Sequence, residues 1–222
     1  MDRKRELLFL TGILVAAVIC RGLLLGRDLE YDEIWSLMNY SQLPVGKIFT
    51  DLATPNNHPL NTVLIKLLWF SRDYPWTIRL GSLFFSLGSV VLLYALGKMF
   101  YRRYGAWYAA AAGAFLPPLI VSGATARGYA GQLFFLLLCA YALLKCRKGS
   151  LFWSISAAAS GIAAILALYS SILYLFPLGI FFLLYQFRKR RILPVHWITF
   201  SLAALLAAAW YGMNFTSFRQ SQ

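Results

Sequence analysis

Residues 78–97 read IRLGSLFFSLGSVVLLYALG, an apolar run in which Arg79 is the only charged side chain. A helix that crosses the hydrocarbon core of a bilayer needs about 20 mostly apolar residues. This segment has that length and composition, so it predicts a transmembrane helix with Arg79 at one mouth. Lipid, rather than water, is the expected solvent for this part of the chain.

Six more apolar segments extend this prediction to the whole chain. Hydrophobic residues make up 60% of the 222 residues and charged residues only 13%, about half of the charged fraction usual in soluble domains. The predicted fold class is all-α: a polytopic membrane protein with about seven transmembrane helices and an outer first loop that carries short interfacial helices. In the third span, Pro117-Pro118 predicts a kink. The spans are predicted near residues 7–25, 78–97, 106–123, 129–144, 151–169, 172–187 and 195–211.

The net charge of +13 is distributed in a way that indicates membrane topology. Lys and Arg accumulate in cytoplasmic loops, and basic clusters occur before the first predicted span and after every second one. We therefore expect a multi-pass protein of the inner or plasma membrane, with a cytoplasmic N-terminus, an outer C-terminus and no nucleic-acid partner. The clusters are Arg3, Lys4 and Arg5; Lys98, Arg102 and Arg103; Lys145, Arg147 and Lys148; and Arg188, Lys189, Arg190 and Arg191.

The loop at about residues 26–77 lies on the outer side in this topology, and it is too long for a simple connector. It holds six of the eight acidic residues of the chain. One short helix is expected to start at Asp32 or Glu33 and to run to Tyr40. A second is expected to start at Pro59, because proline suits the first helical position and the apolar side chains that follow recur with helical spacing.

Asp32 and Glu33 are adjacent, and adjacent side chains of a helix do not face each other. This arrangement does not suit two carboxylates that must flank one glycosidic bond. One carboxylate acting as a general base fits better, and Asp32 is the candidate. The alternative is that Asp32 only caps its helix, because Asp is a favoured N-cap. The residues alone leave both interpretations open.

Polar residues at two further places could bind an anion. Residues 56–60, NNHPL, lie at the start of the second short helix, whose free N–H groups favour phosphate. The alternative there is a polar N-cap with a solvated His58. Arg79 and Arg127 lie at the outer ends of predicted spans. Either could snorkel to lipid headgroups or hold a phosphate that enters from the membrane.

Four motifs, in this order and on this side of the membrane, resemble the GT-C glycosyltransferases, which include the protein O-mannosyltransferases and the aminoarabinose transferase of lipid A. The resemblance covers about residues 7–215. It implies a single GT-C-like transmembrane module over residues 1–222, with an outer catalytic loop at about 26–77 and without the C-terminal part of the family. The motifs are Tyr31-Asp32-Glu33, Asn57-His58-Pro59-Leu60, Arg79-Leu80-Gly81-Ser82 and Arg127-Gly128-Tyr129.

The resemblance also implies a set of site residues. Asp32 matches the family's catalytic carboxylate and Glu33 its acidic neighbour, so these two are the expected catalytic residues. Arg127 matches an arginine implicated in holding the phosphate of the lipid-linked donor. Leu60 and Thr125 depart from the family, which has a second proline and often an acid at these positions. The expected substrate-binding residues are Tyr31, Asn57, His58, Arg79, Arg127 and Tyr129.

The implied reaction is the transfer of a sugar from a polyprenyl-phosphate donor to an acceptor hydroxyl at the outer membrane face, with inversion and with Asp32 as the base. No cofactor and no metal ligands are expected, and a divalent cation stays open. The expected partners are the lipid-linked donor, membrane lipids, and an acceptor that is a lipid, a glycan or a protein. Two alternatives belong to other classes: a flippase or transporter of lipid-linked sugar, and an inactive membrane scaffold.

Overall fold

The computed structural model describes residues 3–51, 57–68, 74–101, 103–146, 150–188, 197, 200–201, 203–210 and 212. In this part of the chain all regular structure is helical and no strand occurs. The all-α prediction is therefore confirmed.

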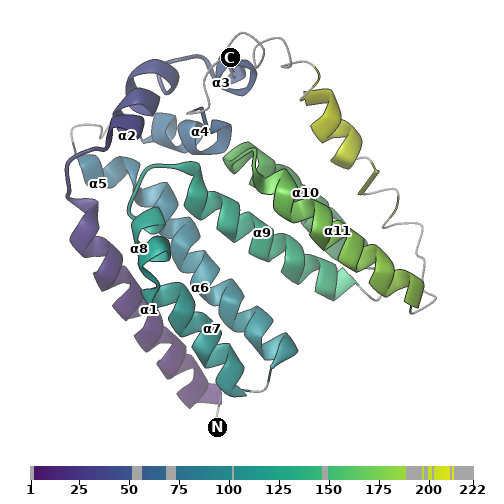
Figure 1. Ribbon diagram of the computed structural model, residues 1–222. Coiled ribbons are helices and arrows are strands. Elements are labelled where there is room, and N and C mark those ends of the chain that lie inside the picture. Colours follow the sequence, from purple (N-terminus) through teal and green to yellow (C-terminus); the bar gives the residue numbers. More distant parts are fainter. Residues whose placement is uncertain are drawn as a thin grey trace.

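Several of the helices have the length and composition of membrane spans. Four qualify singly, and α7 with α8 makes a fifth if this bent pair is counted as one span. In Figure 1 these helices and α10 lie in one layered bundle, in which α6 packs against α7 and α9, and α9 packs against α10. They indicate a multi-pass membrane protein. The helices are α1 (Arg3–Leu25), α6 (Leu80–Phe100), α7 (Arg103–Phe115), α8 (Pro117–Gly123), α9 (Gly128–Lys145), α10 (Leu151–Ala167) and α11 (Ser171–Arg188).

The predicted count of seven spans is wrong, because the described residues hold four qualifying helices, or five with the bent pair. The predicted fifth segment forms α10, which has 17 residues because the chain becomes extended at Leu168. That is shorter than the roughly 20 residues that a span needs. The predicted last segment, 195–211, lies partly outside the described residues. Counting apolar segments overestimates the number of spans, because composition does not show where a helix ends.

The predicted kink at Pro117-Pro118 is confirmed, since α7 and α8 meet at 58°. Proline lacks the N–H that would continue the helical ladder, so carbonyl groups at the break lose their helical donors. Arg21 of α1 is fully buried beside this break. Its guanidinium donates to the carbonyl oxygens of Gly113 at 2.9 Å and Leu119 at 3.3 Å. A side chain thus satisfies backbone groups for which lipid offers no donor.

The segment between α1 and α6 forms a cap of short helices at one end of the bundle (Figure 1). The two short helices expected from the sequence are present, the first as α2 with η1 and the second as α4. The ends of α1, α6, α9 and α11 that carry basic residues lie at the opposite end of the bundle. The cap comprises α2 (Tyr31–Trp35), the π-helical η1 (Ser36–Tyr40), α3 (Val45–Thr50), α4 (Pro59–Leu67) and α5 (Pro75–Ile78).

Candidate functional site

An ion pair joins the first turn of α2 to the start of α9. Arg127 Nη1 donates to Asp32 Oδ2, although the two residues are 95 positions apart in the sequence. Their side chains are 16% and 32% exposed, so a ligand could reach the pair from outside the protein. The N-cap of α2 is Glu30, which forms a capping box with Glu33. The alternative that Asp32 serves only as the helix cap is therefore wrong.

A second ion pair, between Arg79 and Glu33, is almost completely buried. Glu33 accepts hydrogen bonds from Arg79 Nε at 2.9 Å and from Arg79 Nη2 at 2.5 Å. The other N–H groups of Arg79 donate to the carbonyl oxygens of Leu25, Arg27 and Asp28 at 2.8–3.0 Å. All five N–H donors of Arg79 are thus used within the protein. This arrangement favours a role in positioning the cap over the predicted role in binding substrate.

Glu33 also holds the turn that carries Arg127. Its Oε1 accepts the backbone N–H of Ala126 at 2.5 Å, and its Oε2 accepts the backbone N–H of Glu30 at 2.9 Å. Burial acts to raise the pKa of Glu33, but the hydrogen bonds from Arg79, Ala126 and Glu30 outweigh it and lower the pKa below its ordinary value. Glu33 is therefore a charged anchor that sets the position of the α9 turn relative to α2.

His58 lies at the N-cap of α4 and is only 4% exposed, so the alternative of a solvated histidine is wrong. Neither ring nitrogen has a hydrogen-bond partner among the described residues. Burial, followed by the positive charge of Arg127, lowers the pKa of His58 to about 4, against the opposing effect of Asp32. The imidazole is therefore neutral near pH 7. Its ring centroid is 6.3 Å from that of Tyr129.

Asn57 is fully buried and connects the cap internally. Its side-chain amide donates to the carbonyl oxygens of Ile48 at 2.8 Å and Asp51 at 2.5 Å. The backbone carbonyl oxygen of Asn57 accepts a hydrogen bond from Tyr169 Oη at 2.7 Å. These contacts favour a structural role for Asn57 at the base of the loop, rather than direct contact with a substrate.

Two residues that position the site were missed in the sequence analysis. Asn61 Nδ2 of α4 donates to the carbonyl oxygen of Ala126 at 2.7 Å, so α4 also holds the turn before Arg127. Its position on the polar face of the predicted helix was a usable signal. Tyr169, which binds Asn57, stands in an apolar segment, and no local pattern distinguishes it.

The two tyrosines of the predicted site differ in their surroundings. Tyr129 is half-exposed, and its ring centroid lies 5.1 Å from the guanidinium carbon of Arg127, a cation–π arrangement. Tyr31 is 71% exposed and packs against Trp35 at 5.9 Å between ring centroids. The structure therefore groups Asp32, His58, Arg127 and Tyr129, with Glu33 and Arg79 buried beside them.

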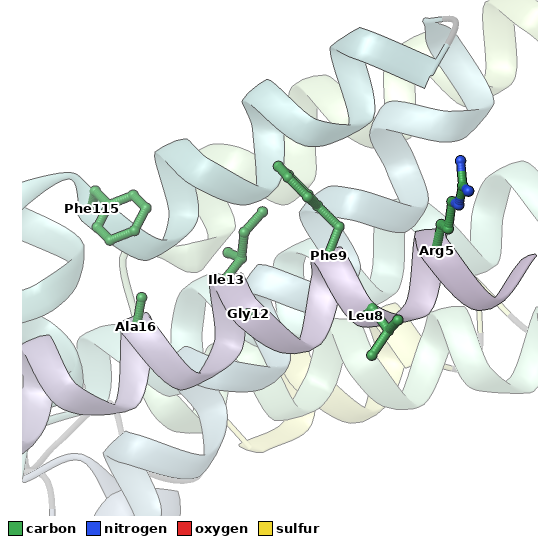
Figure 2. A pocket seen from close by; sticks show the side chains of 7 residues that line it. All are labelled: Arg5, Leu8, Phe9, Gly12, Ile13, Ala16 and Phe115. Carbon is green, nitrogen blue, oxygen red and sulfur yellow. The ribbon is translucent and has the colours of Figure 1, made fainter. Parts of the chain in front are cut away.

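Two cavities lie away from this group. A groove of about 450 Å³ runs along α1, and Figure 2 shows the seven residues that line it, all apolar except Arg5. A second cavity, of about 460 Å³, lies between α9, α10, α11 and residues 197, 200, 201, 203, 204 and 207. Asp32, His58 and Arg127 line neither of them. The candidate site is thus defined by its charges and by buried polar groups, and not by these cavities.

Within the described residues, no group of three or more His, Cys, Asp or Glu side chains could hold a metal ion. Comparison of the chain with protein-family models, with curated proteins and with solved structures found no match. The geometry where α2, α4 and α9 meet is the feature of the chain that bears on function.

Proposed function

We propose that the chain is a membrane glycosyltransferase that moves a sugar from a polyprenyl-phosphate donor to an acceptor hydroxyl, with inversion. The observation that carries this proposal is the contact between Asp32 and Arg127. A carboxylate that can accept a proton and a guanidinium that can bind phosphate meet at the turn before α9. Because the phosphate already leaves well, sugar transfer from a lipid phosphate needs no strong general acid. It needs a base for the acceptor hydroxyl and a cation for the departing phosphate.

In the proposed reaction, Asp32 accepts the proton of the acceptor hydroxyl while its oxygen attacks the anomeric carbon. The bond between that carbon and the phosphate oxygen breaks, and its electron pair stays on the phosphate. Arg127 stabilises this charge through its fork of donors. Asp32 then loses the proton to water. A single displacement inverts the anomeric centre. Both carboxylate oxygens of Glu33 accept hydrogen bonds from Arg79, so Glu33 is not available as a second catalytic carboxylate, which supports one displacement over two.

The distribution of charge supports a site at the outer face. The basic ends of α1, α6, α9 and α11 lie opposite the cap, and basic residues are retained in the cytoplasm. Arg127 is the N-cap of α9. A phosphate at the membrane surface can reach it there while the polyprenyl chain stays in lipid. The acceptor would be a lipid, a glycan or a protein that presents a hydroxyl there.

The test uses the full chain in proteoliposomes that contain a series of polyprenyl-phosphate sugars with labelled sugar groups, together with a cell-envelope extract as the source of acceptors. The parent should transfer label, Asp32→Asn should not, and Asp28→Asn should match the parent. Asp28 is a matched control because it is an exposed acid of the same loop. Movement of the labelled lipid across the bilayer without transfer would indicate a flippase instead. The absence of both activities would indicate a scaffold.

A further inference from the structure

The start of α9 has the features of an anion site. The helix has 18 residues, and its N-cap, Arg127, is extended at φ −129° and ψ 165° and makes no capping hydrogen bond with its side chain. The first N–H groups of a helix have no intrahelical acceptor, and the helix dipole adds positive potential there. A guanidinium and a helix N-terminus thus stand together at Arg127.

His58 provides an independent indication of a ligand at the same place. A Cβ atom added to Gly128, the first residue of α9, would stand 3.2 Å from His58 Cγ, so the imidazole lies directly against this turn. The same added atom would overlap the carbonyl oxygen of Ala167, which explains the glycine. His58 is almost completely buried, and neither of its ring nitrogens has a partner among the described residues. A buried polar group without a partner costs stability, and its retention needs an explanation.

We propose that His58 donates a ring N–H to the phosphate of the polyprenyl donor, and that Arg127 and the first turn of α9 bind the other phosphate oxygens. This inference rests on the proposed function and assigns the phosphate to one place within it. A neutral imidazole adds a donor without adding charge, so it leaves the proton affinity needed at Asp32 largely unchanged. Both ring nitrogens are shielded in this conformation, so binding of the phosphate requires side chains around His58 to move.

Binding of two matched probes tests the proposal on the full chain in lipid nanodiscs. Polyprenyl phosphate carries the anion, and polyprenol of the same chain length does not. His58→Phe should weaken binding of the phosphate roughly tenfold, the usual loss of a hydrogen bond to a charged group, and leave polyprenol binding unchanged. His58→Gln keeps an N–H donor and should retain most of the affinity. His196→Phe, which alters the other of the two histidines, is the control.

Nitrogen-15 spectra of the imidazole give a second readout that does not depend on activity. In the His196→Gln variant His58 is the only imidazole of the chain. Its ring resonances at pH 7 should move on addition of polyprenyl phosphate and stay in place on addition of polyprenol. Unmoved resonances under saturating phosphate lipid would overturn the assignment, whatever the substitutions do to folding.

The failure of this inference and that of the proposed function are distinguishable. If Arg127→Ala abolishes binding of polyprenyl phosphate and His58→Phe does not weaken it, the donor site stands and His58 is not part of it. If the parent binds the phosphate no better than polyprenol, both the proposed donor and the role of His58 are wrong.

Discussion

Asp32 and Glu33, adjacent in α2, hold two adjacent residues of the turn before α9. Asp32 pairs with the Arg127 side chain, and Glu33 accepts the backbone N–H of Ala126. The two carboxylates differ in what surrounds them, because Glu33 is fully buried against Arg79 and Asp32 is partly exposed. One acid thus fixes the turn, and the other meets its cation where a ligand can compete for it.

This competition leads to an unusual expectation for Asp32→Asn. Sugar transfer should fall by about 10²–10⁴-fold, the usual contribution of a general base. Binding of polyprenyl phosphate should strengthen by up to about fivefold, because a partly exposed ion pair is worth up to about 1 kcal/mol and its removal frees Arg127. Transfer assays and nanodisc binding measure the two effects, with Asp28→Asn as the control. Weaker phosphate binding in Asp32→Asn would contradict competition for Arg127.

Substitution of Arg127 should distinguish phosphate binding from snorkelling. Arg127→Ala should weaken binding of polyprenyl phosphate, and Arg127→Lys should restore it only in part, because lysine lacks the planar fork of donors. Arg27→Ala removes an exposed cation of the same loop and should bind like the parent. Equal binding by Arg127→Ala and the parent would leave Arg127 with no role beyond contact with lipid headgroups.

Substitution of Arg79 should mainly lower the stability of the protein, rather than its affinity for a ligand. Arg79→Ala leaves the carboxylate of Glu33 buried without its cation, which typically costs about 3–5 kcal/mol of unfolding free energy. Thermal unfolding in detergent should therefore show a strong loss for Arg79→Ala and none for Arg27→Ala. A stable Arg79→Ala protein that no longer binds polyprenyl phosphate would instead support the role in substrate binding predicted from the sequence.

His58 should make stability depend on pH. The pKa of His58 is lowered from 6.5 to about 4 in the folded protein, so between these values the unfolded chain binds a proton that the folded protein does not. The contribution of His58 to stability should be fully present above pH 6.5 and fall by about 3 kcal/mol as pH decreases to 4. His58→Gln should flatten this slope, and His196→Gln should not. An unchanged slope in His58→Gln would mean that other groups cause the acid sensitivity.

The proposed orientation can be tested by cysteine labelling in a background without the three native cysteines. Gln42 of the cap and Lys4 at the basic end of α1 are both exposed. Gln42→Cys should react with a membrane-impermeant thiol reagent in intact cells, whereas Lys4→Cys should react only after permeabilisation. Reaction of Lys4→Cys in intact cells would place the candidate site on the cytoplasmic side.

The lipid environment, the helical class and the candidate site residues could be predicted from the sequence. Long apolar runs have no stable alternative to helices in lipid, and Pro117 breaks its helix for a local covalent reason. Pro59 likewise marks the start of α4, because its ring and missing N–H act within one turn. Arg127 could be selected as a candidate because few charged residues stand at the ends of the apolar segments. Asp32 could be selected because it belongs to the Tyr31-Asp32-Glu33 motif, which resembles that of the GT-C glycosyltransferases.

Which of these residues meet depends on how the helices pack. Asp32 and Arg127 are far apart in sequence, and so are Glu33 and Arg79. No local pattern encodes either pair, because each depends on how α1, α6 and α9 pack and on the turns between them. His58 is buried against the Gly128 turn, where α9 closely approaches the end of α10, and its burial keeps the imidazole neutral. Desolvation is produced by surrounding atoms, and those atoms come from distant parts of the chain.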